Sequence, residues 1–92
     1  MKKQVYVKIS GKVQGVFFRS EACEEARKLG LKGWVRNTKD GGVEVVVQGE
    51  EERLEHFITW CWDGPDRAQV KNVEIERRGQ LEDFSDFSIR PS

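Results

Sequence analysis

Residues 14–19, Gln-Gly-Val-Phe-Phe-Arg, join a glycine-containing loop to the start of an expected helix. At such a junction, successive backbone N–H groups and the positive end of the helix dipole can point into one concavity and bind an anion. Arg19 falls in the first helical turn, where its planar guanidinium can clamp two oxygens of a phosphate or carboxylate. The segment lacks the Gly-Lys-Ser/Thr of a nucleotide-binding Walker loop, and short glycine loops before helices are also common without any ligand.

Asn37 is the second residue with a chemical use, because it closes an expected strand just before a tight turn. An amide at such a position commonly caps the turn by hydrogen bonding to nearby backbone groups. The same amide can instead hold a water molecule. From this residue and its neighbours alone, both roles remain open.

Hydrophobic periodicity predicts the elements that position these residues. Alternating apolar residues indicate strands, and apolar residues three or four positions apart indicate helices. The expected order is a strand over Val5–Ser10, a helix from Phe18 to Leu29 that Gly30 ends, a strand over Leu31–Asn37, a strand with Val43, Val45 and Val47 that Gly49 breaks, a helix that begins at Glu50–Glu52 and ends at Gly64-Pro65, a strand within Gln69–Arg77, and a short strand with Phe87 and Ile89.

This order predicts an α+β fold, the ferredoxin-like βαββαβ sandwich. A helical crossover after the first strand is almost always right-handed, and the third strand then lies between the first and the second. We expect an antiparallel sheet with two helices on one face plus a short C-terminal strand. We also expect residues 1–92 to form one domain, since a chain of this size suits one compact core. The fold alone does not decide function, because it hosts many.

Charge and composition exclude several classes of partner. Sixteen Lys and Arg balance sixteen Asp and Glu, so the formal net charge is zero. Such a chain has no global field to attract nucleic acid or an anionic membrane. No stretch approaches the roughly 18 apolar residues of a membrane span. The first ten residues alternate like a strand and do not form the apolar block of a signal peptide, so we expect a cytoplasmic protein.

Other residue types that can do chemistry are less informative. Cys23 and Cys61 are too far apart for a zinc site or a dithiol motif, and both free thiols and an interhelix disulfide remain open. His56, the only histidine, lies off the apolar stripe of its helix and is expected in solvent. The run Glu50–Glu52 splays around a helix axis and cannot converge on one metal ion.

Two long blocks resemble the signature sequences of the acylphosphatase family: GKVQGVFFR at 11–19 and GWVRNTKDGGVEVVVQG at 33–49. The resemblance continues through nearly the whole chain, including WCWDGP at 60–65 and DFSIRPS at 86–92. It implies a monomeric enzyme, without metal or cofactor, that hydrolyses small acyl phosphates to a carboxylate and inorganic phosphate. It implies that Arg19 and Asn37 are catalytic, that Asn37 orients the attacking water, and that Thr38 makes no direct contact with substrate. The substrate-binding residues that it implies are Gln14, Gly15, Val16, Phe17, Phe18 and Arg19.

The chemistry of an acyl phosphate agrees with so short a set of residues. Its leaving group is a carboxylate whose acid has a pKa near about 4, so it departs without a general acid. Phosphoryl transfer mostly needs positioning and electrostatic stabilisation, which a backbone cradle and one arginine can supply. The alternative is a non-catalytic phosphate-binding or interaction module of the same fold. An RNA-binding module is disfavoured, because the third strand carries no stacking aromatics.

Overall fold

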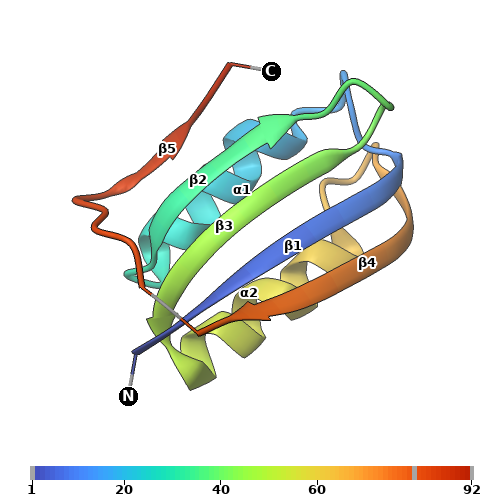
Figure 1. The fold of residues 1–92 in the computed structure, drawn as a ribbon. Coiled ribbons are helices and arrows are strands. Elements are labelled where there is room, and N and C mark those ends of the chain that lie inside the picture. Colours follow the sequence, from blue (N-terminus) through green and yellow to red (C-terminus); the bar gives the residue numbers. More distant parts are fainter. Residues whose placement is uncertain (1, 80, 92) are drawn as a thin grey trace.

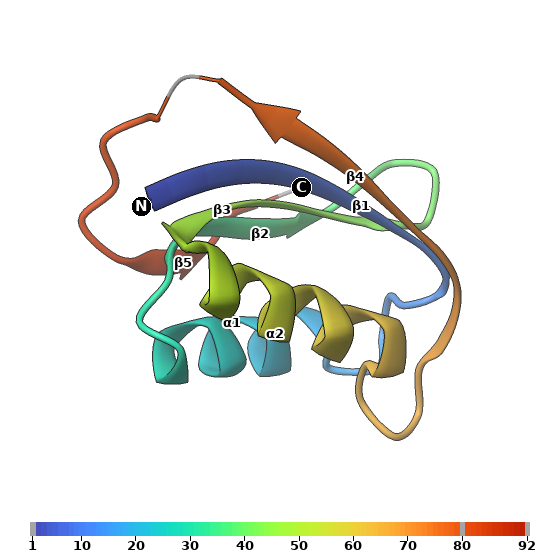
Figure 2. The same ribbon diagram turned by 90° about the horizontal axis from the view of Figure 1, so that it is seen from below.

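The computed structural model describes residues 2–79 and 81–91, which form a sheet and two helices (Figure 1). Both helices lie on the same face of the sheet (Figure 2). Neither helix combines the length and apolar character that a membrane span requires. In chain order the elements are β1 (Lys2–Lys12), α1 (Phe18–Lys28), β2 (Lys32–Asn37), β3 (Val43–Glu50), α2 (Glu51–Asp63), β4 (Gln69–Arg78) and β5 (Phe87–Ile89).

The strand order is β4-β1-β3-β2-β5, which confirms the predicted ferredoxin-like arrangement. The first four strands pair antiparallel, whereas β5 pairs parallel to β2 with Ile89 beside Val35, so the complete sheet is mixed. The parallel pairing follows from the path of the chain. After β4 the chain crosses the sheet at the end where β2 begins, and it can only continue alongside β2 in the same direction (Figure 1).

The crossing segment between β4 and β5 is fixed by two buried glutamines on the open face of the sheet. The Gln48 side chain donates to Gln4 Oε1 at 2.9 Å and to the Glu82 carbonyl at 2.8 Å. The Glu82 backbone N–H donates to the same Gln4 oxygen at 2.9 Å. Because buried amides need partners, these bonds specify one path for the segment. That path decides where β5 meets β2.

The core lies between the sheet and the helices. Alternate residues of β1 and β3 face it, as their period of two predicted. The helices contribute aromatic contacts: Phe18 packs on Trp60 with ring centroids 5.3 Å apart, and Phe57 packs on Phe87 at 6.1 Å. The first of these contacts anchors the start of α1 to α2. Buried members of the helices are Phe18, Ala22, Cys23, Ala26, Leu54, Phe57 and Cys61.

Several element boundaries differ from those expected, and the third strand differs most. Gly49 was expected to break it, yet β3 continues to Glu50 because Gly49 pairs with Lys3 of β1. A side chain there would meet Leu31 at 2.4 Å, so glycine serves close packing and does not end the strand. The first strand is likewise longer than expected, since it has partners on both sides.

Cys23 and Cys61 are free and buried, so the structure favours two thiols over the disulfide alternative. Burial raises the pKa of Cys61, so this sulfur stays protonated and is a poor nucleophile at neutral pH.

We expect a thiol reagent to modify Cys61 only when the protein unfolds. Cys23 should react earlier, because it borders a surface depression beside α1. Titration with and without denaturant, followed by mass spectrometry, checks this order. A native protein lighter by the two hydrogens of a disulfide would contradict it.

Candidate active site

The loop before α1 has the backbone conformation of an anion cradle. Gly15 has φ 74° and Phe17 has φ 65°, both in the left-handed region, with Val16 between them. Such alternation turns successive N–H groups toward one side. Phe17 is the N-cap of α1 and provides no side-chain hydrogen bond to it. The N–H groups of the first helical turn therefore remain available to a ligand.

Arg19 lies in this first turn and borders a depression of about 420 Å³, which we call the loop pocket. The Arg19 side chain is half-buried. No Asp or Glu is among the described residues that line the pocket, so nothing there repels an anion. The lining residues are Val13, Gly15, Phe17, Phe18, Arg19, Ser20, Asn37 and Ile89.

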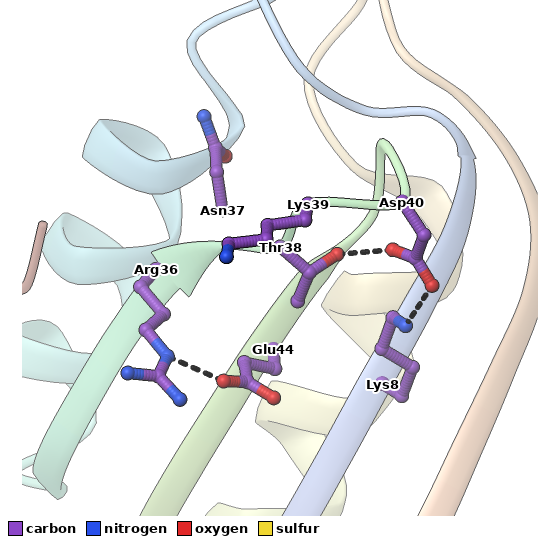
Figure 3. Close-up of a pocket in the computed structure, with 7 residues that line it drawn as sticks. All are labelled: Lys8, Arg36, Asn37, Thr38, Lys39, Asp40 and Glu44. Atoms are coloured by element: carbon purple, nitrogen blue, oxygen red, sulfur yellow. Dashed lines mark hydrogen bonds and ion pairs between the residues drawn. The ribbon is translucent and has the colours of Figure 1, made fainter. Parts of the chain in front are cut away.

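Asn37 reaches the loop pocket from the end of β2. Because side chains alternate along a strand, Asn37 projects to the opposite face from Arg36, as Figure 3 shows. Its Oδ1 atom is buried, and no described residue donates a hydrogen bond to it. A buried polar atom without a partner is uncommon in a folded protein and requires an explanation. Its place beside Arg19 and the cradle identifies it as a candidate ligand-binding group.

Gln14 connects the loop to the β2–β3 hairpin. Its side-chain amide donates to the carbonyl of Thr38 at 2.7 Å and to the carbonyl of Gly42 at 2.8 Å. Thr38 directly follows Asn37, so these two bonds fix the cradle relative to the Asn37 backbone. Both donor hydrogens of the amide are thereby used within the protein.

The hairpin turn after Asn37 is held by a polar network of its own (Figure 3). Lys8 Nζ lies 2.8 Å from Asp40 Oδ2, and the Thr38 hydroxyl donates to the other Asp40 oxygen. The Gly42 N–H lies 3.1 Å from Thr38 Oγ1 and 3.2 Å from Asp40 Oδ1. These donors, Lys8 foremost, lower the pKa of Asp40 from its usual value of 3.8 to about 2.

On the open face of the sheet, Arg36 is paired and therefore not available to an anion in the loop pocket. Its Nε donates to Glu44, and the Tyr6 hydroxyl donates to the other Glu44 oxygen at 2.7 Å. Burial alone would raise the pKa of Glu44, but the bonds from Tyr6 and Arg36 outweigh it and lower the pKa. Burial, assisted by Glu44, raises the pKa of Tyr6 to about 12. Near neutral pH Glu44 therefore stays a carboxylate and Tyr6 stays an uncharged phenol.

Sequence comparison identifies the family. Residues 5–89 match the family model described as Acylphosphatase. The chain belongs to the acylphosphatase family. The acylphosphatase of Pelotomaculum thermopropionicum is 48% identical over 86 residues, which cover 94% of each chain. The acylphosphatase structure from Coxiella burnetii superposes with a TM-score of 0.93 at 44% identity and covers 97% of this chain and 93% of its own.

The acylphosphatase fold also matches part of a much larger protein. A structure of full-length HypF, in a phosphate- and nucleotide-bound form, aligns with a TM-score of 0.87 at 28% identity. The match covers 98% of this chain but only 12% of that one. The same unit therefore occurs both in chains of this length and within a longer polypeptide.

The structure brings together most of the residues that the sequence indicated. Arg19 and Asn37 line one pocket, although 17 positions separate them in the sequence. Gly15, Phe17 and Phe18 also line it. The side chains of Gln14 and Val16 do not: Gln14 binds the hairpin, and Val16 is buried in the core. Only their backbone groups remain candidates for substrate contact.

Three residues that line the loop pocket were not predicted from the sequence, namely Val13, Ser20 and Ile89. Ile89 comes from β5, and no spacing in the sequence relates that strand to the loop. Thr38 does not line this pocket, and it lies instead on the sheet side of the hairpin. Within residues 2–79 and 81–91, no group of three His, Cys, Asp or Glu side chains is placed to hold a metal ion. His56 is exposed on α2, as expected.

Replacing Asp40 with Asn should destabilise the hairpin in a pH-dependent way. The folded-state pKa lies below the usual value, so the carboxylate stabilises the fold above pH 3.8 and loses this effect as the pH falls toward about 2. Asp40→Asn should therefore be less stable than wild type near neutral pH, and the difference should shrink as the solution is acidified. Urea unfolding across this pH range checks the expectation, and a constant difference would contradict it.

Proposed function

We propose that this acylphosphatase binds the phosphoryl group of its substrate with the 14–19 backbone and Arg19, and that the Asn37 amide orients the attacking water. Family membership makes the chain an enzyme that hydrolyses acyl phosphates to a carboxylate and inorganic phosphate. The observation that carries the finer proposal is that Asn37 lines the same pocket as Arg19 and has an amide oxygen without a partner among the described residues.

Phosphate binding relies on two kinds of donor. The N–H groups of the loop and of the first turn of α1 supply short, fixed hydrogen bonds at the positive end of the helix dipole. Arg19 adds a permanent charge with a forked geometry. No carboxylate pairs with Arg19 in the part of the chain that the structure describes, so binding phosphate breaks no ion pair. Both kinds of donor stabilise the equatorial oxygens during transfer.

Asn37 suits a water-positioning role because its amide offers both an acceptor and donors. The amide can hydrogen-bond the water in the loop pocket and so aim the water's lone pair at phosphorus. A water held beside the cradle attacks from a fixed position. Such positioning lowers the activation barrier, because the translational and rotational entropy of bringing water and substrate together is lost on binding and not in the reaction step.

The reaction needs few further groups. The water oxygen forms the new bond to phosphorus, the bond from phosphorus to the acyl oxygen breaks, and the carboxylate leaves with the electron pair. The water proton passes to a phosphoryl oxygen of the substrate, so the second product is inorganic phosphate. The loop pocket has no Asp, Glu or His among its described lining residues, which agrees with a mechanism that uses no protein general base. We expect turnover to persist with a chelator, because no metal is required by these steps.

The alternative expected from the sequence is a non-catalytic phosphate-binding module of the same fold, and family membership favours the enzyme over it. The two candidates differ in what the cradle does after binding. A binding module holds phosphate and releases it unchanged, whereas the enzyme also consumes benzoyl phosphate. Ultraviolet absorbance follows that hydrolysis directly. Rapid turnover by the chelator-treated protein supports the enzyme, and phosphate binding without turnover supports the module.

The remaining proposals concern the cellular location, the oligomeric state and the binding partners of the protein. We propose that it acts as a cytoplasmic monomer on small molecules and binds neither nucleic acid nor membranes. A formal net charge of zero supports the absence of nucleic-acid and membrane binding, because no general electrostatic attraction draws polyanions to the chain.

Asn37→Ala should lower kcat by about 10²- to 10³-fold, the loss typical of one positioned polar group. Inhibition by inorganic phosphate should change little, since the cradle and Arg19 are intact. The free energy of unfolding should fall by less than about 0.5 kcal/mol, because the buried oxygen has no partner to lose. Benzoyl phosphate kinetics and urea unfolding measure these quantities. Asn72→Ala, on exposed β4, is the matched control, and wild-type turnover by Asn37→Ala would refute the water-positioning role.

Arg19→Ala should weaken both phosphate inhibition and turnover, with at least about a tenfold rise in the phosphate inhibition constant. Arg19→Lys should recover only part of this affinity, since an ammonium keeps the charge but not the fork. Steady-state kinetics with added phosphate tests both variants. Arg67→Ala removes an exposed arginine outside the pocket and serves as the control. Normal phosphate inhibition of Arg19→Ala would disprove the assignment.

A further inference from the structure

Two exposed apolar side chains border the loop pocket and are not used by the phosphate chemistry. Phe17 is 69% exposed and Ile89 is 45% exposed, and both line the pocket. They are two of five large hydrophobic side chains that are exposed among the described residues. Apolar side chains that gather at a ligand site commonly recognise an apolar part of the ligand.

Phe17 is an unfavourable residue type both for its backbone conformation and for its position at the start of α1. It has φ 65°, in the left-handed region, where a bulky side chain is strained and where Gly or Asn is favoured. It is also the N-cap of α1, a position that prefers Ser, Thr, Asp or Asn. The backbone conformation therefore does not explain an aromatic residue here. The exposed ring is instead placed to contact a ligand in the loop pocket.

Ile89 lies in β5, where hydrogen bonds on both sides of the strand hold it in place. It pairs with Val35 in the β2–β5 ladder, and the next residue, Arg90, donates its N–H to the Val35 carbonyl at 2.9 Å. On the outer side of β5, Arg27 Nε donates to the Phe87 carbonyl at 3.1 Å. The short strand is thus fixed on both sides, and Ile89 presents a preorganised apolar surface.

The loop pocket does not end at the phosphate cradle. A second depression of about 570 Å³ runs beside α1, and it shares Ser20 and Ile89 with the loop pocket. An acyl phosphate bound by its phosphoryl group therefore has space for its acyl group beyond the cradle. Phe17 and Ile89 are the large exposed apolar residues of the loop pocket, and Ile89 also borders the second depression.

We propose that Phe17 and Ile89 form an acyl-group subsite that selects acyl phosphates with an aromatic or branched apolar acyl group over those with an acetyl or carbamoyl group. This proposal rests on the phosphate-binding mode given above. A methyl or amino group is too small to contact both side chains, whereas a phenyl ring buries more apolar surface against them. The subsite adds no chemical step. It changes only how strongly different acyl groups are held during the same reaction.

The test is the ratio of kcat/KM for benzoyl phosphate to kcat/KM for acetyl phosphate. Phe17→Asn removes the ring but introduces a residue that tolerates the left-handed backbone. Ile89→Thr removes apolar surface but introduces a residue that favours strands. Each variant should lower the ratio, and the double variant should lower it by about tenfold or more, as removal of apolar pocket contacts typically does. Changes in the shared phosphate cradle affect both substrates and cancel in the ratio.

Matched controls come from exposed apolar residues elsewhere. Ile75→Thr replaces a strand isoleucine with the same 45% exposure as Ile89, and Trp62→Gln replaces a 49% exposed aromatic residue on α2. Neither should change the ratio. An unchanged ratio in Ile89→Thr and in the double variant would overturn the subsite. Failure of the underlying phosphate-binding mode looks different, because Arg19→Ala would then show normal phosphate inhibition and normal turnover of both substrates whatever the ratio.

Discussion

The pair of hydrogen bonds from the Gln14 side chain is the interaction on which the candidate site depends. The cradle and Asn37 belong to different elements, and each is only locally defined. Gln14 Nε2 lies 2.7 Å from the Thr38 carbonyl and 2.8 Å from the Gly42 carbonyl, so one amide joins the loop to both sides of the hairpin turn. Without these bonds, only the packing of α1 against the sheet would set the distance between Arg19 and Asn37. Positioning within a fraction of an ångström is what phosphoryl transfer requires.

Charge pairing around the site complements this geometry. Lys8 is paired with Asp40, and Arg36 with Glu44, on the face of the sheet away from the loop pocket. Arg19 has no such partner among residues 2–79 and 81–91. An anion therefore meets one uncompensated cation at the start of α1. A chain with no net charge can in this way hold a local anion site without a general attraction for polyanions.

Features that oppose stability are concentrated at the same place. Asn37 has a buried oxygen without a partner among the described residues, and Phe17 has a left-handed backbone. Elsewhere, buried polar side chains such as Gln4 and Gln48 have partners. Departures from local rules that gather at one pocket indicate selection for ligand binding over stability.

The sequence by itself determined the order of the elements, the apolar faces of the strands and helices, and the residue types of the cradle. These follow from local periodicity and from glycine and arginine at the start of a helix, which act over a few neighbouring residues. The tertiary structure alone decided the parallel pairing of β5, the role of Gln14 as a bridge, and the place of Ile89 beside Phe17 and Arg19. Each of these joins segments that are distant along the chain. Their contacts depend on how the chain crosses the sheet, which no local pattern encodes.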